Sequence, residues 1–475
     1  MLFNSFEFFI FFVFVLTIYY LLNRKSQNVF LLAASYLFYG FWDWRFLFLL
    51  FVTSAVDYFI SHIIHVTENP NKRKHILLIS LVANLGVLGF FKYYNFFIDN
   101  FMVLTSSFGM TIEPWLLNVI LPVGISFYTL QSMSYTIDVY RRNIIPCSNF
   151  LDFLLYVSFF PQLVAGPIER ASNLIPQLQQ KRIVNYEDIR KGCFLILFGL
   201  FQKVVIADNL GIVVDKVFSH PAQHSGVDLI IGTYAFAFQI YCDFSGYSSM
   251  AIGIARLLGI ELMTNFKAPY LSASPGEFWH RWHISLSTWL KDYLYIPLGG
   301  NRSGNIYMNL MLTMLIGGLW HGANWTMLIW GGMNGLYLVV NRKLSLLLPK
   351  RSALFSSKIA MKISSIAGVL ITFNLICIAW IFFRATTLTN AVEYLSHIYV
   401  NFNWGIHDVH HFSAVALGLM GIMLSFDILY CRAGEVPFFC MNWGTVRRAL
   451  VYTFLLISII FFGVGHVQSF IYFQF

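Results

Sequence analysis

Residues 306–340 read IYMNLMLTMLIGGLWHGANWTMLIWGGMNGLYLVV, and this stretch decides the fold class. It consists of two apolar runs, 306–320 and 324–340, with His321 at the turn between them. Apolar runs of membrane-spanning length recur along the whole chain. An ionisable side chain at membrane depth is costly and usually lines a cavity where something is bound or reacted. The sequence therefore predicts a membrane hairpin with His321 beside a buried reaction chamber.

Composition supports the same fold class. The 475 residues are 58% hydrophobic and only 11% charged, whereas an ordinary soluble domain has about 25% charged residues. We expect an all-α polytopic membrane protein that forms one membrane-embedded domain over residues 1–475. Its core carries the motifs at about 115–340, and peripheral spans occupy 1–100 and 363–475. No long polar stretch remains for an appended soluble domain.

The basic residues suggest an orientation. Cytoplasmic loops of membrane proteins accumulate Lys and Arg, which accounts for the net charge of +9 without a nucleic-acid partner. The first basic clusters follow the first, third and fifth apolar runs, so all three fit the cytoplasmic side if the N-terminus is outside. Continued alternation predicts about twelve transmembrane helices with both termini on the extracytoplasmic side. The clusters are Arg24/Lys25, Lys72–Lys74 and Arg141/Arg142, after candidate spans 5–22, 29–41, 46–65, 76–98 and 115–139.

Two segments interrupt the alternation. The run 150–168 contains Pro161, Gly166 and Pro167, and non-helical backbone at membrane depth survives only where protein or a watery cavity shields it. We predict a re-entrant element there. Residues 277–300 mix aromatic, basic and hydroxyl side chains, which predicts a second broken or interfacial element. The remaining candidate spans are 192–208, 228–258, 306–320, 324–340, 363–383, 412–430 and 449–466.

A second histidine cluster lies in the segment Phe278-Trp-His-Arg-Trp-His-Ile-Ser-Leu-Ser-Thr-Trp289. His280 and His283 are three apart, so on one helix they share a face. That spacing also suits a metal pair, but no nearby set of ligands completes a tetrahedral site, so we expect no metal. The simpler alternative is an interfacial aromatic and basic belt, with serines that only bond helix carbonyls. The candidate lining residues are Trp279, Trp282, Ser285 and Ser287.

A third polar patch interrupts the run 228–258. Asp243 is a carboxylate at membrane depth, and Ser245 and Tyr247 follow it. Asp243 is suited to orienting a histidine, pairing with an arginine or holding a substrate hydroxyl. The alternative is that these are helix-packing polar residues. Trp320 and Asn324, which flank His321, are further candidates for lining the chamber.

These motifs resemble the membrane-bound O-acyltransferase superfamily, in particular its branch that O-acetylates bacterial alginate. The resemblance covers roughly residues 1–340, and the C-terminal third matches mainly as apolar spans. The superfamily's histidine in an apolar stretch corresponds to His321, and its second polar position, Asn or His, to His283. His280 stands where the family more often has Arg, so we transfer no role to it. The matching pieces are Leu121–Tyr128, Ser134–Arg141, Gly166-Pro167, Asp243–Ser248, Trp282–Arg302 and Gly318–Trp325.

The resemblance implies a protein of the bacterial cytoplasmic (inner) membrane, with a central tunnel and the histidine at its constriction. It implies acetyl-CoA or another acetyl thioester as cytoplasmic donor, no permanently bound cofactor, and an outer-face partner protein that delivers the acetyl group to a polysaccharide. We expect His321 to be the general base on an acceptor hydroxyl. We expect His283, with Asp243 or Asn324, to position the thioester or stabilise the oxyanion. Peptidoglycan O-acetylation, D-alanyl transfer and, from a different class, a transporter or flippase remain alternatives.

Overall fold

The computed structural model describes residues 1–110, 116–117, 120–164, 166–347, 358–401, 411–433, 440, 443–464 and 470–473. Over these ranges the ordered elements are all helices, and there is no strand. Contacts between Cα atoms divide the chain into two compact units. Unit 1 comprises 1–193 with 251–263, and unit 2 comprises 194–250 with 264–475. Two of the three boundaries fall inside helices, and the third falls in the loop at residues 263–264. The prediction of a single domain stays a prediction.

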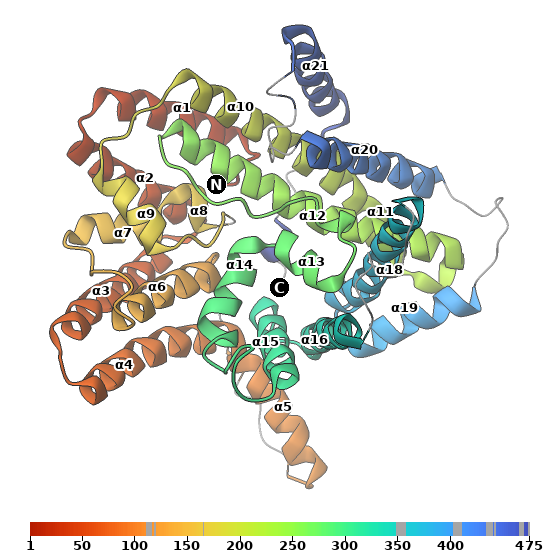
Figure 1. The fold of residues 1–475 in the computed structure, drawn as a ribbon, viewed down its shortest axis with the longest axis horizontal. Helices are drawn as coiled ribbons and strands as arrows, with labels where there is room; N and C mark the ends of the chain where they lie inside the picture. Colours follow the sequence, from red (N-terminus) through yellow and green to blue (C-terminus); the bar gives the residue numbers. More distant parts are fainter. Residues whose placement is uncertain are drawn as a thin grey trace. The chain divides into compact units, whose positions relative to one another are not determined.

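Unit 1 is built from short-looped helices. In Figure 1, α2, α3, α4, α6 and α7 lie side by side, and their contacts agree. Polar caps set several starts: the side chains of Ser5, Asn23 and Asn69 each accept a backbone N–H from the first turn that follows, which satisfies otherwise unpaired donors. The helices are α1 (Phe6–Leu21), α2 (Arg24–Asp43), α3 (Arg45–Val66), α4 (Pro70–Leu88), η1 (Gly89–Tyr93), α5 (Tyr94–Ser107), α6 (Ile125–Tyr140), α7 (Phe150–Ser158), α8 (Phe160–Leu163), α9 (Ala171–Gln179) and the first part of α10 (Tyr186–Phe201).

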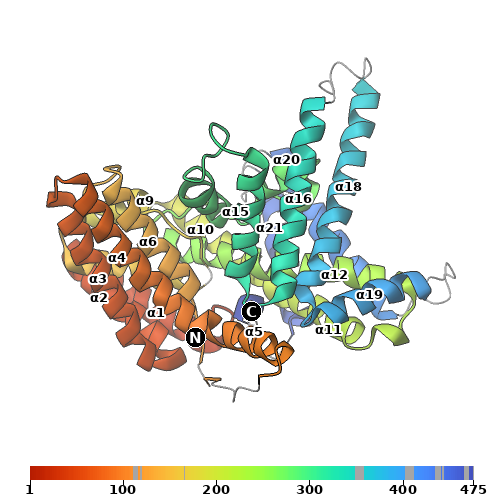
Figure 2. The same cartoon turned by 90° about the horizontal axis from the view of Figure 1, so that it is seen from below.

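Unit 2 contains the predicted hairpin. Figure 2 shows α15 and α16 running side by side, with α18 packed against α16. The helices of this unit after α10 are η2 (Gln202–Ala207), α11 (Asp208–Ser219), η3 (Pro221–Gln223), α12 (Gly226–Leu257, up to residue 250), η4 (Pro269–Leu271), α13 (Pro275–Arg281), α14 (Ile284–Leu290), η5 (Lys291–Tyr295), α15 (Ile306–His321), α16 (Trp325–Leu347), α18 (Lys358–Arg384), α19 (Leu388–Val400), α20 (His411–Ala433), α21 (Thr445–Phe462) and η7 (Ile471–Phe473).

The helix lengths support a multi-pass membrane protein. Among the described residues, seven helices are long and apolar enough to cross a membrane, and three shorter apolar helices accompany them. The prediction of about twelve spans therefore stays a prediction. One candidate span is shorter than predicted, because α6 begins at Ile125 rather than near residue 115.

The two segments that the sequence marked as broken are broken. The first interruption falls at Phe159, between α7 and α8, so Pro161 lies in the first turn of a new helix, where its missing N–H costs nothing. The second falls at Trp282 and His283, between α13 and α14. By contrast, the polar patch at Asp243 does not interrupt its helix, since α12 runs unbroken through it.

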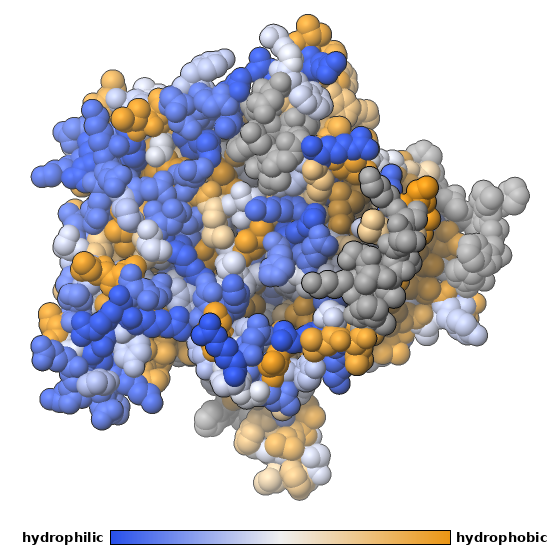
Figure 3. All heavy atoms as spheres, in the orientation of Figure 1, coloured by the Kyte–Doolittle hydropathy of each residue, from blue (hydrophilic) through white to orange (hydrophobic). Residues whose placement is uncertain are grey.

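The basic loops of unit 1 are joined to one another. The Arg24 guanidinium bonds the carbonyl of Gln179, the Arg73 guanidinium bonds that of Tyr140, and Arg182 Nη2 donates to Asn28 Oδ1 at 2.6 Å. Figure 3 shows hydrophilic residues gathered on one face over these helices. These bonds link the Arg73 cluster to the residue that precedes Arg141, and they link Arg24 and Arg182 each to a neighbouring segment. That this side is cytoplasmic stays a prediction.

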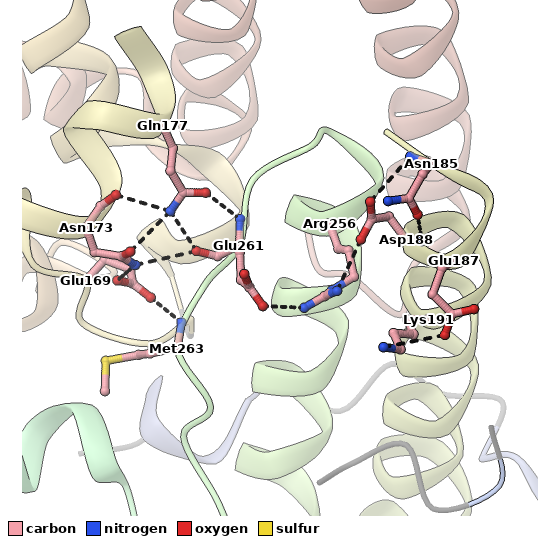
Figure 4. Close-up of polar contacts among 10 residues, drawn as sticks. All are labelled: Glu169, Asn173, Gln177, Asn185, Glu187, Asp188, Lys191, Arg256, Glu261 and Met263. Carbon is pink, nitrogen blue, oxygen red and sulfur yellow. Dashed lines mark hydrogen bonds and ion pairs between the residues drawn. The ribbon is translucent and has the colours of Figure 1, made fainter. Parts of the chain in front are cut away.

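A second polar cluster in unit 1 fixes the loop that follows α12 (Figure 4). The buried Glu169 carboxylate accepts the backbone N–H of Met263 and, at 2.8 Å, the Asn173 amide. The Gln177 side chain bonds both backbone groups of Glu261, with distances of 2.8 and 3.0 Å. These bonds hold residues 261–263, which directly precede the segment that holds His283.

Candidate active site

His321 ends helix α15 and is buried. The hairpin brings the two helices unusually close: a Cβ on Gly318 would lie 2.3 Å from the Met327 carbonyl, and one on Gly331 would lie 2.4 Å from that of Met314. Glycines at both contacts let the backbones approach, as in membrane helix pairs generally. The imidazole of His321 is therefore fixed by a rigid hairpin rather than by a loop.

His283 is placed by a backbone turn. Its φ of +41° puts it in the left-handed region, between the end of α13 and the start of α14. This costs of order 1–3 kcal/mol for a residue that is not glycine, and such strain is found at sites where the surrounding structure enforces it. The turn directs the ring into the interior of unit 2, where its exposed fraction is 0%. Because α13 ends at Arg281, the expected shared face with His280 does not exist, and His280 is exposed.

Asn265 holds the His283 ring. Its Oδ1 lies 3.1 Å from His283 Nδ1 and also accepts the backbone N–H and the hydroxyl of Ser285, at 3.1 and 3.0 Å. The backbone N–H of Ser285 can only donate, which identifies the atom facing His283 as the oxygen Oδ1, and Nδ2 lies 3.2 Å from Ser248 Oγ. Nδ1 of His283 therefore carries the proton, and Nε2 presents a lone pair. Burial lowers the pKa of His283 to about 3, so the ring is neutral at physiological pH.

The two histidines lie in one buried cluster of aromatic side chains, which we call the chamber. The Trp320 ring centroid lies 4.9 Å from that of His321 and 6.2 Å from that of His283. On another side, Phe244 lies 4.6 Å from both His283 and Tyr472, and Tyr472 lies 5.5 Å from His321. Segments from α12, from α15 and from the C-terminal end thus meet between the imidazoles.

Large aromatic side chains form the wall of this chamber. Trp282 and Trp330 are fully buried, and both contact the ring of Trp380, at 5.1 and 5.6 Å. Trp330 also lies 5.1 Å from His321 and 5.8 Å from Trp279. Of the predicted aromatic residues, Trp320 contacts both histidines directly. Trp282 reaches His283 through Phe266, and Trp279 reaches His321 through Trp330.

The predicted polar residues take different positions. Ser285 bonds Asn265 beside His283, but Ser287 donates to the Trp282 carbonyl, which is the simpler role considered for it. Asn324 caps α16, accepting the N–H of Thr326 at 3.1 Å, and its amide donates to the Thr386 carbonyl at 2.9 Å. Asn324 does not lie within the histidine cluster; it lines a neighbouring pocket.

That pocket is lined by the residues that directly follow His321 in the sequence. Its volume is about 440 Å³. Gly322 and Asn324 line it from the hairpin, and Arg384 and Thr386 line it from the end of α18. Arg384 pairs with Asp215 at 2.8 Å, so a cation lies at the rim.

Asp243 pairs with a residue that the sequence did not single out. Its Oδ1 lies 2.8 Å from Lys203 Nζ, and its Oδ2 accepts the backbone N–H of Ile471 at 2.7 Å. Ser245 accepts a bond from Gln202 at 2.9 Å, and the Tyr247 ring lies 4.7 Å from Phe470. This patch therefore connects α12 to the C-terminal segment, a relation that none of the three expected roles of Asp243 included.

Sequence reasoning missed Asn265, Lys203 and Tyr472. Asn265 and Lys203 lie in no histidine-bearing motif, and only the tertiary structure shows their partners. A signal for Tyr472 existed in the aromatic run Phe470-Ile-Tyr-Phe-Gln-Phe475 at the very end of the chain.

Comparison with known proteins places this site in a family. The profile of the membrane-bound O-acyltransferase family matches residues 140–386, more than half of the chain. A Pseudomonas putida protein named probable alginate O-acetylase AlgI is 37% identical over 493 residues, covering 98% of each sequence. A peptidoglycan O-acetyltransferase of Helicobacter pylori is 41% identical, covering 79% of this chain and 75% of its own. A teichoic acid D-alanyltransferase of Streptococcus thermophilus is 26% identical, covering 61% of this chain and 75% of its own.

Proposed function

The chain belongs to the membrane-bound O-acyltransferase family, and we propose that it O-acetylates an extracytoplasmic polysaccharide of the alginate kind. The donor is acetyl-CoA or another cytoplasmic acetyl thioester. The observation that carries this proposal is the convergence of His283 and His321 on one buried aromatic chamber. The near full-length similarity to an alginate O-acetylase supports the acyl group and the acceptor class.

In this proposal His321 is the general base. A neutral imidazole takes the proton from the attacking hydroxyl and returns it to the leaving thiolate, which typically contributes about 10²–10⁴-fold in rate. His283 has a different task, because its Nδ1–H is engaged with Asn265 and its Nε2 can only accept. An acceptor nitrogen cannot stabilise an oxyanion. Of the two roles expected for His283, positioning the donor fits better, through an N–H or O–H group of the thioester's carrier arm.

Tyr472 carries a hydroxyl on a ring whose centroid lies 5.5 Å from that of the base. Its oxygen is buried with no hydrogen-bond partner among the residues that the structure describes, and its ring contacts His321. Burial raises the pKa of Tyr472, so the phenol needs a base to become nucleophilic. We propose that His321 removes this proton, that the Tyr472 oxygen attacks the thioester carbonyl, and that the thiolate leaves with the proton from His321. The product is an acetyl ester on Tyr472.

An outer-face partner protein then takes the acetyl group from this ester to the polysaccharide. We assign the pocket lined by Gly322 and Arg384 to the acetyl group as it leaves Tyr472 for the partner.

The test of the acetyl ester replaces Tyr472 by Phe, which removes one oxygen and keeps the ring. Mass spectrometry of the C-terminal peptide, after incubation with acetyl thioester and no acceptor, should find one acetyl group on the wild-type peptide and none on Tyr472→Phe.

A second candidate is peptidoglycan O-acetylation, which the 41% identity to the Helicobacter pylori enzyme favours. Membranes containing the chain and its native partners should be given radiolabelled acetyl donor with alginate-like polymer or with peptidoglycan fragments. We expect label in the alginate-like polymer. Label in peptidoglycan alone would identify peptidoglycan as the acceptor and refute the alginate-like one. Transfer of D-alanine instead of acetyl would refute the proposed acyl group. Movement of an unmodified solute without any transfer would identify a transporter.

A further inference from the structure

We propose that the buried ion-pair network of Lys203, Asp208 and Asp243 is a clasp that seats the C-terminal tail, residues 470–473, in the chamber. The three side chains are positioning residues: they act on the reaction through the tail. The catalytic consequence rests on the proposed function, whereas the seating of the tail does not.

The clasp begins with a close helix contact. A Cβ on Gly199 would lie 2.5 Å from the Gly246 carbonyl, and one on Gly246 would lie 2.7 Å from that of Gly199. Directly after Gly199 the helix α10 widens into the π-helical turn η2, which carries Lys203. Such turns are rare and concentrate at functional sites. The combination brings the Lys203 side chain against the polar patch of α12.

Lys203 is shared between two carboxylates. Its Nζ lies 2.7 Å from Asp208 Oδ1 and 2.8 Å from Asp243 Oδ1, and the three side chains are at most 4% exposed. Burying such charges is tolerated only when they are paired and further hydrogen-bonded. Three well-packed hydrophobic side chains of similar volume would stabilise the contact between these helices equally well or better. The charges therefore point to a task other than bracing.

That task is shown by the second oxygen of Asp243. Oδ2 accepts the N–H of Ile471, the first residue of the short helix η7, at 2.7 Å. The two residues next to Ile471 in the sequence make ring contacts. Phe470 packs on Tyr247, and Tyr472 packs on Phe244 and towards His321. One buried hydrogen bond thus fixes where the Tyr472 ring lies.

The first test separates the hydrogen bond from the charges. Both test chains carry Lys203→Met and Asp208→Asn, which remove the two charges that face position 243. One chain then carries Asp243→Asn and the other Asp243→Leu, and these two side chains have similar volumes. Asn still accepts the Ile471 N–H, whereas Leu cannot. We expect the Asn chain to keep the tail seated and the Leu chain to release it. Equal seating in the two chains would overturn the proposal.

Seating is read by crosslinking, independently of activity. Phe470→Cys and Tyr247→Cys, in a chain whose six native cysteines are replaced by alanine, place two thiols where rings now lie 4.7 Å apart. A short thiol crosslinker should join them in the Asn chain and fail in the Leu chain. If crosslinking follows this pattern while no acetyl transfer is found in any chain, the clasp stands and the proposed function fails.

The second test changes only the tail, so it does not depend on the folding of a neutralised core. Ile471→Pro removes the donated N–H at the first position of η7, where proline fits the backbone. Ile471→Ala removes the side chain and keeps the N–H. We expect kcat to fall about 10–100-fold for Ile471→Pro, because displacing a reacting group by about 1 Å lowers the rate by that order. The KM for the thioester should be nearly unchanged. Equal kcat values for the two variants would contradict the clasp.

Discussion

At His283 the backbone conformation and the tautomer are both set by the Asn265 amide, whereas burial keeps the ring neutral. That amide bonds the ring, the Ser285 N–H and the Ser285 hydroxyl, and the Asn265 carbonyl accepts the N–H of Ile284. A left-handed residue that is not glycine persists only when its surroundings determine it this strongly.

Asn265 should therefore matter although it touches no substrate in the proposed reaction. Asn265→Leu removes every side-chain bond to the His283 turn, and we expect kcat to fall about 100-fold through misplacement of the ring. Asn265→Asp keeps oxygens that accept from Ser285 and His283, so this variant should retain clearly more activity. Measured kcat values for the two variants, at matched expression, check this. Equal losses would mean that Asn265 acts on folding alone.

Burial of His283 also predicts how stability depends on pH. The pKa is about 3 in the folded chain and about 6.5 in the unfolded chain, so the unfolded state binds the proton more readily. Stability is unaffected above about pH 6.5 and falls as the pH drops towards 3, by up to about 1.4 kcal/mol per pH unit. The thermal midpoint in detergent should fall between pH 7 and pH 4 by more in the wild type than in His283→Gln. Parallel declines would show that His283 is not buried and neutral.

Among elements, the hairpin of α15 and α16 was the most predictable and the most constrained. Two apolar runs with a short turn require it, and the glycines at its contact were visible in the sequence. The broken element at 277–300 was predictable too, because its composition suits no regular span. The left-handed turn at His283 was not, since nothing in Trp282-His-Ile marks a helix end. For the polar patch around Asp243 the error was the opposite one. The sequence predicted an interruption of the apolar run there, but α12 continues unbroken through the patch.

The hairpin provides a matched pair of glycine substitutions. Gly318→Ala places a methyl group 2.3 Å from a backbone carbonyl, so the helices must separate, at a cost of about 1–3 kcal/mol. Gly332→Ala meets only Leu315 Cδ2, at 3.5 Å, and should be neutral or stabilise by up to about 1 kcal/mol, because alanine favours helix. Thermal midpoints of the two variants in detergent give the comparison. A stable, active Gly318→Ala would mean that close approach does not place His321.

In the whole molecule, composition and loop charge were enough to predict a multi-pass helical membrane protein. Motif reasoning predicted that two distant histidines meet, and the structure brings both to one chamber in unit 2. The residues that organise the chamber were beyond reach, because Asn265, Lys203 and Tyr472 acquire their roles only through contacts between distant segments. The division into two compact units was not visible either, since two of its three boundaries fall inside the continuous helices α10 and α12.

The most direct test of the account compares two histidine variants of the same chain in proteoliposomes loaded with radiolabelled acetyl-CoA. His321→Gln removes the proposed base, whereas His280→Gln changes an exposed histidine outside the chamber. Label bound to the chain, or passed to partner and polymer, should fall by about 10²–10⁴-fold for His321→Gln and stay near the wild-type level for His280→Gln. Undiminished transfer by a correctly inserted His321→Gln chain would contradict the central claim that the buried histidine chamber carries out the acyl transfer.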